Sequence, residues 1–297
     1  MSNKLRKMTL EKKHNLTGWA FLAPATFLIA VFSFWPMIKA LVLSFQTGKG
    51  RNMQMAGFTN YIRMFQDDVF IQSIKNTFFY FILQVPIMLV VALVLACILN
   101  KKDLRFKGFF RTMIFVPCTT SLVAYSIIFR SLFANNGLVN YVLVNIGILD
   151  KPYNFLTHPF AAKIVIILAL LWRWTGYNMV FFLSGLQNIE YSVYEAAKID
   201  GASAIQTFFK ITVPLLKPTI LLTAIMSTNG TLQLFDESVN LTDGGPANAS
   251  ISMSHYIYNL CFKYVPNFGY AAAMSFFILL LVAVLAFIQM RVGDKRD

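Results

Sequence analysis

Residues 187–218 read QNIEYSVYEAAKIDGASAIQTFFKITVPLLKP, and this polar stretch governs how the rest of the chain is interpreted. It joins two segments, 161–186 and 215–235, that are apolar and long enough to cross a lipid bilayer. A polar insert between two membrane spans has to leave the hydrocarbon layer. We therefore expect the 187–218 loop to lie at the membrane surface and to contact a partner there.

The 187–218 loop has the features of two short helices joined by a tight turn. Residues 195–199 favour a helix, and Gly201 ends it because glycine adopts the left-handed conformation at little steric cost. Ser203 can cap a second helix. That helix would carry apolar residues mostly on one side before two prolines interrupt it: Ile205, Phe208, Phe209 and Ile211, then Pro214 and Pro218.

The composition indicates an integral membrane protein. Of the 297 residues, 57% are hydrophobic and only 13% are charged, which is far more apolar than a soluble domain of this length. A helical span needs about 20 apolar residues. Runs of this kind occupy 19–45, 78–99, 109–133, 161–186, 215–235 and 271–290. We predict an all-α integral membrane protein with about six transmembrane helices.

Lysine and arginine are concentrated in alternate connections, which predicts the orientation. Those on one side are Lys4, Arg6, Lys7, Lys12, Lys13, Lys101, Lys102, Arg105, Lys107, Arg111, Arg291, Lys295 and Arg296; those on the other are Lys49, Arg51, Arg63, Lys75, Lys151 and Lys263. Both termini and the 187–218 loop are therefore expected in the cytoplasm. The net charge of +13 reflects this topology. Cations split among short loops argue against nucleic-acid binding.

One membrane domain covers nearly the whole chain, because no Ser/Gly/Pro-rich linker separates the spans. We expect a basic cytoplasmic tail at 1–17, a first span with an external loop at 18–75, a core at 76–291 that contains the 187–218 loop, and a cytoplasmic tail at 292–297. The first apolar run exceeds the roughly 7 to 15 residues of a signal peptide, so it is interpreted as an uncleaved anchor.

Two external connections carry local structure. GFTNYIRMFQDDVF at 57–70 predicts a short helix that starts near Thr59 or Asn60. DGGP at 243–246 predicts a turn, followed by a helix over 251–262 that could lie partly in the membrane.

The residues needed for catalysis or metal binding do not occur in recognisable patterns. His14, His158 and His255 are scattered and form no metal-ligand spacing. The three cysteines, Cys97, Cys118 and Cys261, are interpreted as apolar packing residues. GKGRN at 48–52 lacks the spacing of a phosphate-binding loop. We therefore expect no enzyme activity, no metal and no cofactor bound by this chain.

The 187–218 loop resembles the coupling loop of permease subunits of ABC importers. The signature Glu-Ala-Ala, three residues, Gly, nine residues, Ile-x-Leu-Pro is met by Glu195-Ala196-Ala197, Gly201, Ile211 and Pro214, with Val213 in place of Leu. Glu190 stands where such sugar importers often have Pro, which bears on the geometry at the start of the loop. The plainer interpretation is an amphipathic hairpin on the membrane surface.

The resemblance extends over essentially the whole chain, and Phe235-Asp236, Tyr258 and Gly269-Tyr270 look like the sugar-importer branch. It implies a type I ABC importer permease in a bacterial cytoplasmic membrane. The implied partners are a second homologous permease, two ATP-binding subunits that hold ATP and magnesium, and an extracytoplasmic sugar-binding protein. The residues implied in coupling are Tyr194, Glu195, Ala196, Ala197, Asp200, Gly201, Ala202, Phe208, Ile211 and Pro214.

Polar residues within the fifth predicted span are candidates for contact with the transported solute. Asn229, Gln233, Asp236 and Asn240 recur at intervals of four, three and four, which places them on one face of a continuous helix. Their amide and carboxylate groups can bond sugar hydroxyls. Bonding to neighbouring helices is an equally good explanation for any one of them.

The fourth predicted span contains WRWTGYNMVFFLSGL at 172–186. Trp172, Trp174 and Tyr177 could stack on a sugar ring and Asn178 could bond its edge, although aromatic residues also favour membrane interfaces. For Arg173 a structural ion pair or a snorkelling position is favoured over ligand contact. The predicted substrate pathway comprises Trp172, Tyr177, Asn178, Asn229, Gln233 and Asp236.

Two other functions stay open. A self-sufficient secondary carrier would show inverted repeats and coupling acids at mid-membrane, and no second copy of either half is evident. A non-transporting scaffold or intramembrane enzyme is disfavoured because no catalytic set is found. Only the importer permease requires a nucleotide-binding partner at the 187–218 loop.

Overall fold

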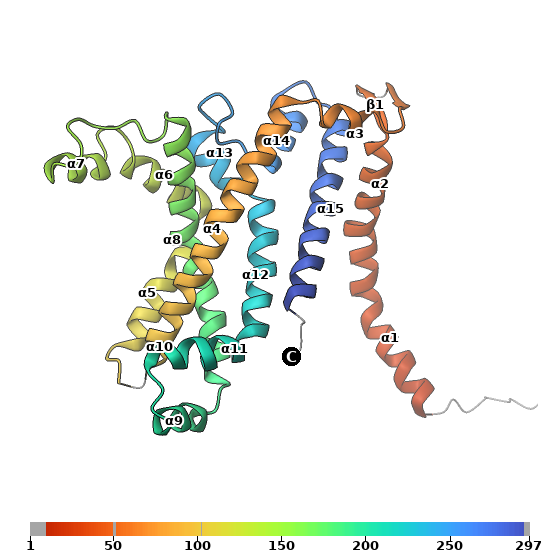
Figure 1. The fold of residues 1–297 in the computed structure, drawn as a ribbon. Coiled ribbons are helices and arrows are strands. Elements are labelled where there is room, and N and C mark those ends of the chain that lie inside the picture. Colours follow the sequence, from red (N-terminus) through yellow and green to blue (C-terminus); the bar gives the residue numbers. More distant parts are fainter. Residues whose placement is uncertain (1–9, 50–51, 102, 294–297) are drawn as a thin grey trace, which may run out of the picture.

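The computed structural model describes residues 10–49, 52–101 and 103–293, which form a helical bundle with short elements at both ends (Figure 1). Four helices are long and apolar enough to cross a membrane, and two bent helix pairs bring the number of candidate spans to as many as six. The all-α prediction therefore holds for the membrane part. A two-stranded antiparallel hairpin, β1 (Gln46–Lys49) and β2 (Asn52–Met55), was not anticipated from the sequence.

The first span lies at the edge of the bundle. It consists of α1 (Leu10–Ile29), a π-helical turn η1 (Ala30–Phe34) and α2 (Trp35–Ser44), which together contain the predicted run 19–45 except its last residue. Its most apolar window is not buried at all within the chain, although α2 packs on α15 (Phe268–Gly293). An apolar helix exposed in this way is covered by lipid or by another subunit.

The centre of the bundle is formed by α4 (Asp68–Asn100) and α8 (Pro159–Gln187), which pack along much of their length. Predicted spans 78–99 and 161–186 fall within them. Towards the α9 end their buried side chains form one apolar cluster with Leu216; members from the two helices include Ala92, Ala96, Met179 and Phe182. A Cβ on Gly176 would overlap the Ile114 carbonyl, so glycine is needed where α8 touches α5.

The third predicted span is not one straight helix. It is divided into α5 (Lys107–Thr119) and α6 (Leu122–Leu132), and their axes differ by 99°. Pro117 lies in the last turn of α5, and Thr120 has an extended backbone. The prediction of an apolar run over 109–133 is confirmed, but the run is not one continuous helix. The helix breaks there because proline removes a backbone donor.

The fifth predicted span also ends earlier than expected. Helix α12 (Lys217–Leu232) stops before Gln233, and α13 (Asp236–Thr242) begins after a short non-helical connection. The carbonyl of Leu234, which this break frees, accepts a hydrogen bond from the Ser252 hydroxyl. The expectation that Asn229, Gln233, Asp236 and Asn240 share one helical face is therefore wrong, since a buried side chain from another element stabilises the break.

The end of the bundle opposite α9 carries α3 (Thr59–Met64), α7 (Leu138–Asn145), α14 (Met253–Tyr258) and η3 (Asn259–Lys263). The predicted helix near Thr59 is confirmed. The 243–246 turn is also confirmed, with Asp243 and Gly244 at positive φ. Asp67 caps α4 and accepts hydrogen bonds of 2.7 Å from Tyr256 and 2.8 Å from Tyr270, which ties α4, α14 and α15 together.

The 187–218 loop forms α9 (Tyr191–Ile199), α10 (Ala204–Thr207), a π-helical turn η2 (Phe208–Thr212) and α11 (Val213–Leu215). Figure 1 shows that α1 begins and α15 ends at this same end of the bundle, as the predicted topology requires. Several predicted positions, Lys4, Arg6, Lys7, Arg51, Lys102, Lys295 and Arg296, lie outside the described residues, as do parts of both predicted tails.

Candidate functional site

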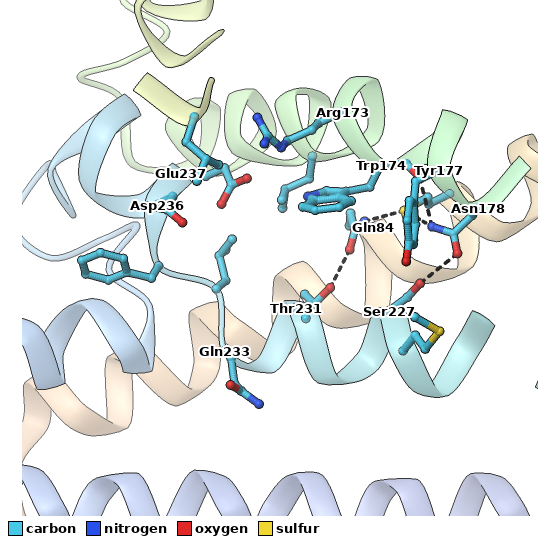
Figure 2. A pocket seen from close by; sticks show the side chains of 17 residues that line it. Gln84, Arg173, Trp174, Tyr177, Asn178, Ser227, Thr231, Gln233, Asp236 and Glu237 are labelled. Atoms are coloured by element: carbon cyan, nitrogen blue, oxygen red, sulfur yellow. Dashed lines mark hydrogen bonds between the residues drawn. The ribbon is translucent and has the colours of Figure 1, made fainter. Parts of the chain in front are cut away.

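A cavity of about 470 Å³ lies inside the bundle between α4, α6, α8, α12 and α13 (Figure 2). We call it the central cavity. Its volume is in the range of small-molecule sites. It combines apolar walls with polar groups from several elements; the lining residues are Gln84, Met88, Leu122, Leu170, Arg173, Trp174, Tyr177, Asn178, Met226, Ser227, Gly230, Thr231, Gln233, Leu234, Phe235, Asp236 and Glu237.

Amide and hydroxyl groups join α4, α8 and α12 along the central cavity. The Thr231 hydroxyl donates to Gln84 Oε1 at 2.9 Å, and the Ser227 hydroxyl donates to Asn178 Oδ1 at 3.3 Å. The Asn178 amide also donates to the Trp174 carbonyl at 3.0 Å. These bonds satisfy the buried amides and fix their orientation.

Charged groups gather where α8 faces α6 and α13. The Tyr125 hydroxyl donates to Glu237 Oε1, and both residues are buried. The Arg173 guanidinium carbon lies 4.7 Å from the centre of the Tyr125 ring and 5.3 Å from that of Trp174. Asp236 lies next to Glu237 on the cavity wall (Figure 2). The cavity therefore has one cation and two acidic side chains on its wall.

Four of the six residues predicted for the substrate pathway line the central cavity: Tyr177, Asn178, Gln233 and Asp236. Two do not. Trp172 faces a separate hollow with Met113 and Thr175, and its ring packs on Tyr125 and Phe129. Asn229 is exposed outside the cavity and accepts a hydrogen bond from Gln233.

Sequence reasoning missed several polar residues of the cavity, namely Gln84, Ser227, Thr231 and Glu237. Gln84 stands in an otherwise apolar run, and Glu237 is an acid at the end of another. Because polar residues within spans are costly unless they face protein or a cavity, the sequence could have indicated these two residues. What the sequence does not contain is the pairing of Gln84 with Thr231, which are 147 positions apart.

The turn at Gly201 forms as predicted. Gly201 has a φ of +74°. The Ala202 amide donates to the Ala197 carbonyl at 2.9 Å and the Gly201 amide to the Lys198 carbonyl at 3.2 Å, which is the Schellman arrangement that ends helices. Ser203 and Gln206 form a capping box at the start of α10. The turn is therefore held by local bonds alone.

The surface of the 187–218 loop exposes large apolar side chains. Ile199 is 86% exposed, Ile205 72% and Phe209 65%. Of the residues implied in coupling, Glu195, Ala196, Asp200, Gly201 and Pro214 are exposed, and Tyr194, Ala202, Phe208 and Ile211 are partly buried. Ala197 is buried within the chain, so its small side chain serves packing inside the loop. An exposed apolar group on a polar loop is typical of a contact surface.

The 187–218 loop is attached firmly to the spans. Phe208 and Val213 pack against the cluster of α4, α8 and Leu216. The hydroxyls of Tyr194 and Thr212 lie 3.4 Å apart and join α9 to η2. A second cavity of about 740 Å³ lies beneath the loop, against the α4–α5 connection. The loop is therefore packed against α8, which also lines the central cavity.

In residues 10–49, 52–101 and 103–293, no group of three or more His, Cys, Asp or Glu residues is placed to hold a metal ion.

The family described as "binding-protein-dependent transport system inner membrane component" matches residues 67–296. The chain is 51% identical to the lactose transport system permease protein of Rhizobium radiobacter, over 98% of each chain. It is 33% identical to the multiple sugar-binding transport system permease protein of Streptococcus mutans, over 97% of this chain and 99% of the relative.

A solved structure also matches. It is a bacterial alginate ABC transporter in complex with an alginate pentasaccharide-bound periplasmic protein, and one of its chains superposes with a TM-score of 0.84. The match covers 96% of each chain at 25% sequence identity.

Proposed function

The chain belongs to the family of binding-protein-dependent transport system inner membrane components, and we propose that it is the transmembrane subunit of an ATP-driven importer for a sugar. The proposed sugar is a small uncharged oligosaccharide of the lactose type. Identity of 51% over nearly the full length to a lactose permease supports this choice.

One observation carries the mechanism: the exposed 187–218 loop and the wall of the central cavity are parts of the same packed unit. Phe208 anchors the loop on the cluster that contains Phe182, and α8 continues from Phe182 to the cavity residues Asn178 and Tyr177. Because packed interiors transmit displacement rather than absorb it, a push on the loop tilts α8 and changes access to the cavity.

The push would come from ATP-binding subunits, which close on ATP and magnesium. In this proposal Glu195, Asp200 and Gly201 face such a subunit, together with the exposed apolar residues Ile199 and Ile205. The loop and both termini then lie in the cytoplasm. A second permease subunit covers the exposed first span, and an extracytoplasmic binding protein delivers the sugar at the opposite end.

The central cavity would hold the sugar midway through transport. Trp174 and Tyr177 supply ring faces, and Gln233, Asp236 and Glu237 supply hydrogen-bonding groups. Asn178 already bonds Ser227 and Trp174, so it shapes the wall more than it offers free donors.

The test is uptake of radiolabelled lactose by proteoliposomes that contain this chain together with its second permease subunit and its ATP-binding subunit, identified by copurification with this chain. We expect uptake that requires ATP, magnesium and the binding protein together. Uptake by the purified chain alone, or uptake driven only by an ion gradient, would instead identify a secondary carrier. Cysteine labelling of residue 201 from the extracytoplasmic side would refute the proposed topology.

A further inference from the structure

Three aromatic side chains form a row that leads from the central cavity towards the end of the bundle opposite α9. Phe235 lines the cavity, and the centre of its ring lies 5.2 Å from that of Tyr258 on α14. The centre of the Tyr258 ring lies in turn 5.4 Å from that of Phe262 on η3. We call these three residues the aromatic row. It links the cavity to the end of the bundle at which α13 and α14 lie (Figure 1).

The rings of the aromatic row become more exposed with distance from the cavity. Phe235 is partly buried, Tyr258 is 37% exposed and Phe262 is 72% exposed. The ring planes are tilted by 59° and 43° between successive members, so the rings do not cover one another by stacking. Tyr256 on the same helix shows the contrast, because it is buried and its hydroxyl donates to Asp67. Core packing therefore explains Tyr256 but not the aromatic row.

Polar groups lie beside the aromatic row at both ends. At the cavity end, Asp236 follows Phe235 and also lines the cavity. At the outer end, Lys263 follows Phe262 and donates to Asp243 at 2.7 Å, and both charged side chains are exposed. Aromatic faces bind apolar surfaces, whereas carboxylate and ammonium groups bond hydroxyls. A ligand that matches this surface has apolar faces and hydroxyl edges, as a sugar ring does.

We propose that the aromatic row is the entry route of the transported sugar, whose rings stack on Phe262, Tyr258 and Phe235 on the way to the central cavity. This inference rests on the proposed function. Continuity with the cavity favours a sugar over lipid, since a row of rings that faces hydrocarbon would have no reason to end at a wall lined by acids and amides. Several weak contacts in succession let a solute enter without being trapped.

The test is the number of lactose molecules taken up per ATP hydrolysed by the assembled complex in proteoliposomes, with sugar supplied by the binding protein. Without a ring at the outer end, sugar released by the binding protein escapes while the ATP-binding subunits complete their cycle. We expect Phe262→Leu to lower this ratio by about threefold to tenfold, the value of one aromatic contact. Phe262→Tyr retains the ring and should keep the ratio close to that of the wild type.

The same comparison is repeated one ring closer to the cavity. Tyr258→Leu should lower the ratio, and Tyr258→Phe should retain it because the ring remains. Tyr141→Leu is the matched control: Tyr141 is an exposed tyrosine on α7, at the same end of the bundle but outside the aromatic row. Its replacement should leave the ratio unchanged.

Three results would overturn the inference. The same ratio in Phe262→Leu and Phe262→Tyr would mean that the ring itself is not needed, as expected for contact with lipid. A fall in uptake and in ATP hydrolysis by the same factor in Phe262→Leu would indicate a docking surface for the binding protein. Failure of both Phe262→Leu and Tyr258→Leu to assemble, measured by size-exclusion chromatography, would assign the aromatic row to structure.

These outcomes separate the inference from the proposed function. If the wild-type complex shows no ATP-dependent uptake of lactose or another neutral disaccharide, the proposed function fails. If the wild type transports lactose and the leucine variants keep its ratio of uptake to ATP hydrolysis, only the entry route fails.

Discussion

The 187–218 loop and the central cavity differ in how their residues are brought together. The turn of the loop is made by residues within a few positions of one another, such as Ala197 with Ala202 and Ser203 with Gln206. The cavity is made by pairs far apart in the chain, such as Tyr125 with Glu237, which are 112 positions apart. Local chemistry is legible in a sequence, whereas long-range pairing depends on how the helices pack.

The two regions also differ in what they expose. The loop presents apolar side chains outward, with Ile199 86% exposed. The cavity hides a charge, with Arg173 6% exposed. Each is unfavourable for an isolated subunit in water or lipid. In the proposed function, a protein partner would cover the loop and a sugar would occupy the cavity.

The largest predicted effect is the loss of sugar-stimulated ATP hydrolysis when a charge is placed at the turn of the loop. No atom lies within 4 Å of the position that a Cβ on Gly201 would take, and its φ is +74°. Gly201→Asp adds a carboxylate to the proposed contact at a backbone conformation that Asp and Asn both tolerate. We expect sugar-stimulated ATP hydrolysis to fall by at least about tenfold because an unpaired charge is buried at the interface.

Gly201→Asn is the matched control, since it has the same shape and conformational preference without the charge. It should keep several times more ATPase activity than Gly201→Asp. Binding of the extracytoplasmic protein, measured by pull-down, should be the same for both. Full coupling in Gly201→Asp would contradict contact between the loop and an ATP-binding subunit.

Two neighbouring tryptophans distinguish the cavity from its surroundings. Trp174 lines the central cavity, whereas Trp172 packs on Phe129 outside it. Trp174→Ala should lower uptake per assembled complex by about threefold to tenfold, the value of one aromatic contact with the sugar. Trp172→Ala should lower the thermal stability and leave uptake per complex nearly unchanged. Equal effects of the two changes on uptake would mean that the sugar does not follow the cavity.

The smallest expected effect is a pH dependence of stability. It should act on the end of the bundle that carries α13 and α14 and leave the 187–218 loop unaffected. Burial lowers the pKa of His255 to about 4, while the facing Asp243 raises it and Lys263 lowers it. In the unfolded chain the pKa of a histidine is about 6.5. Between these values the unfolded state binds a proton that the folded state does not, so stability falls as the pH drops from about 6.5 towards 4.

The midpoint of thermal unfolding should fall by about 3 °C or more between pH 7 and pH 5. His255→Asn retains a hydrogen-bonding group near the Ser238 hydroxyl, which lies 2.9 Å from His255 Nδ1, and it should flatten this dependence. Hydrogen exchange corrected for intrinsic rates should show loss of protection in α13 and α14 before α9. An unchanged slope in His255→Asn would assign the pH dependence to another group.

The fold was predictable wherever a single property of a contiguous segment determined it. Apolar length located the runs 78–99, 161–186 and 271–290, which lie within α4, α8 and α15. It also located 109–133 and 215–235, which bent helix pairs largely cover, but it did not reveal where the helices within these runs are interrupted. At Leu234 the break is stabilised by Ser252, a residue 18 positions away that the local pattern does not contain.

The site was predictable only in part, for the same reason. Aromatic and amide chemistry on the fourth predicted span pointed to Tyr177 and Asn178, which line the cavity, but also to Trp172, which does not; the periodicity of the fifth span included Asn229, which lies outside the cavity. For Arg173 a structural ion pair or a snorkelling position was favoured because a charge within a span is costly to bury. Trp174 is its neighbour in the sequence, but its contact with the Tyr125 ring depends on the packing of α6 against α8.

Hydrophobic length and local turn chemistry act between neighbours in the chain, so the sequence by itself determined the membrane class, the number of apolar runs and the Gly201 turn. The bend at Thr120, the helix break at Leu234 and the cavity that gathers Gln84, Arg173 and Glu237 were decided by the tertiary structure. Close packing of helices distant in sequence determines which polar groups find partners and which stay open for a ligand.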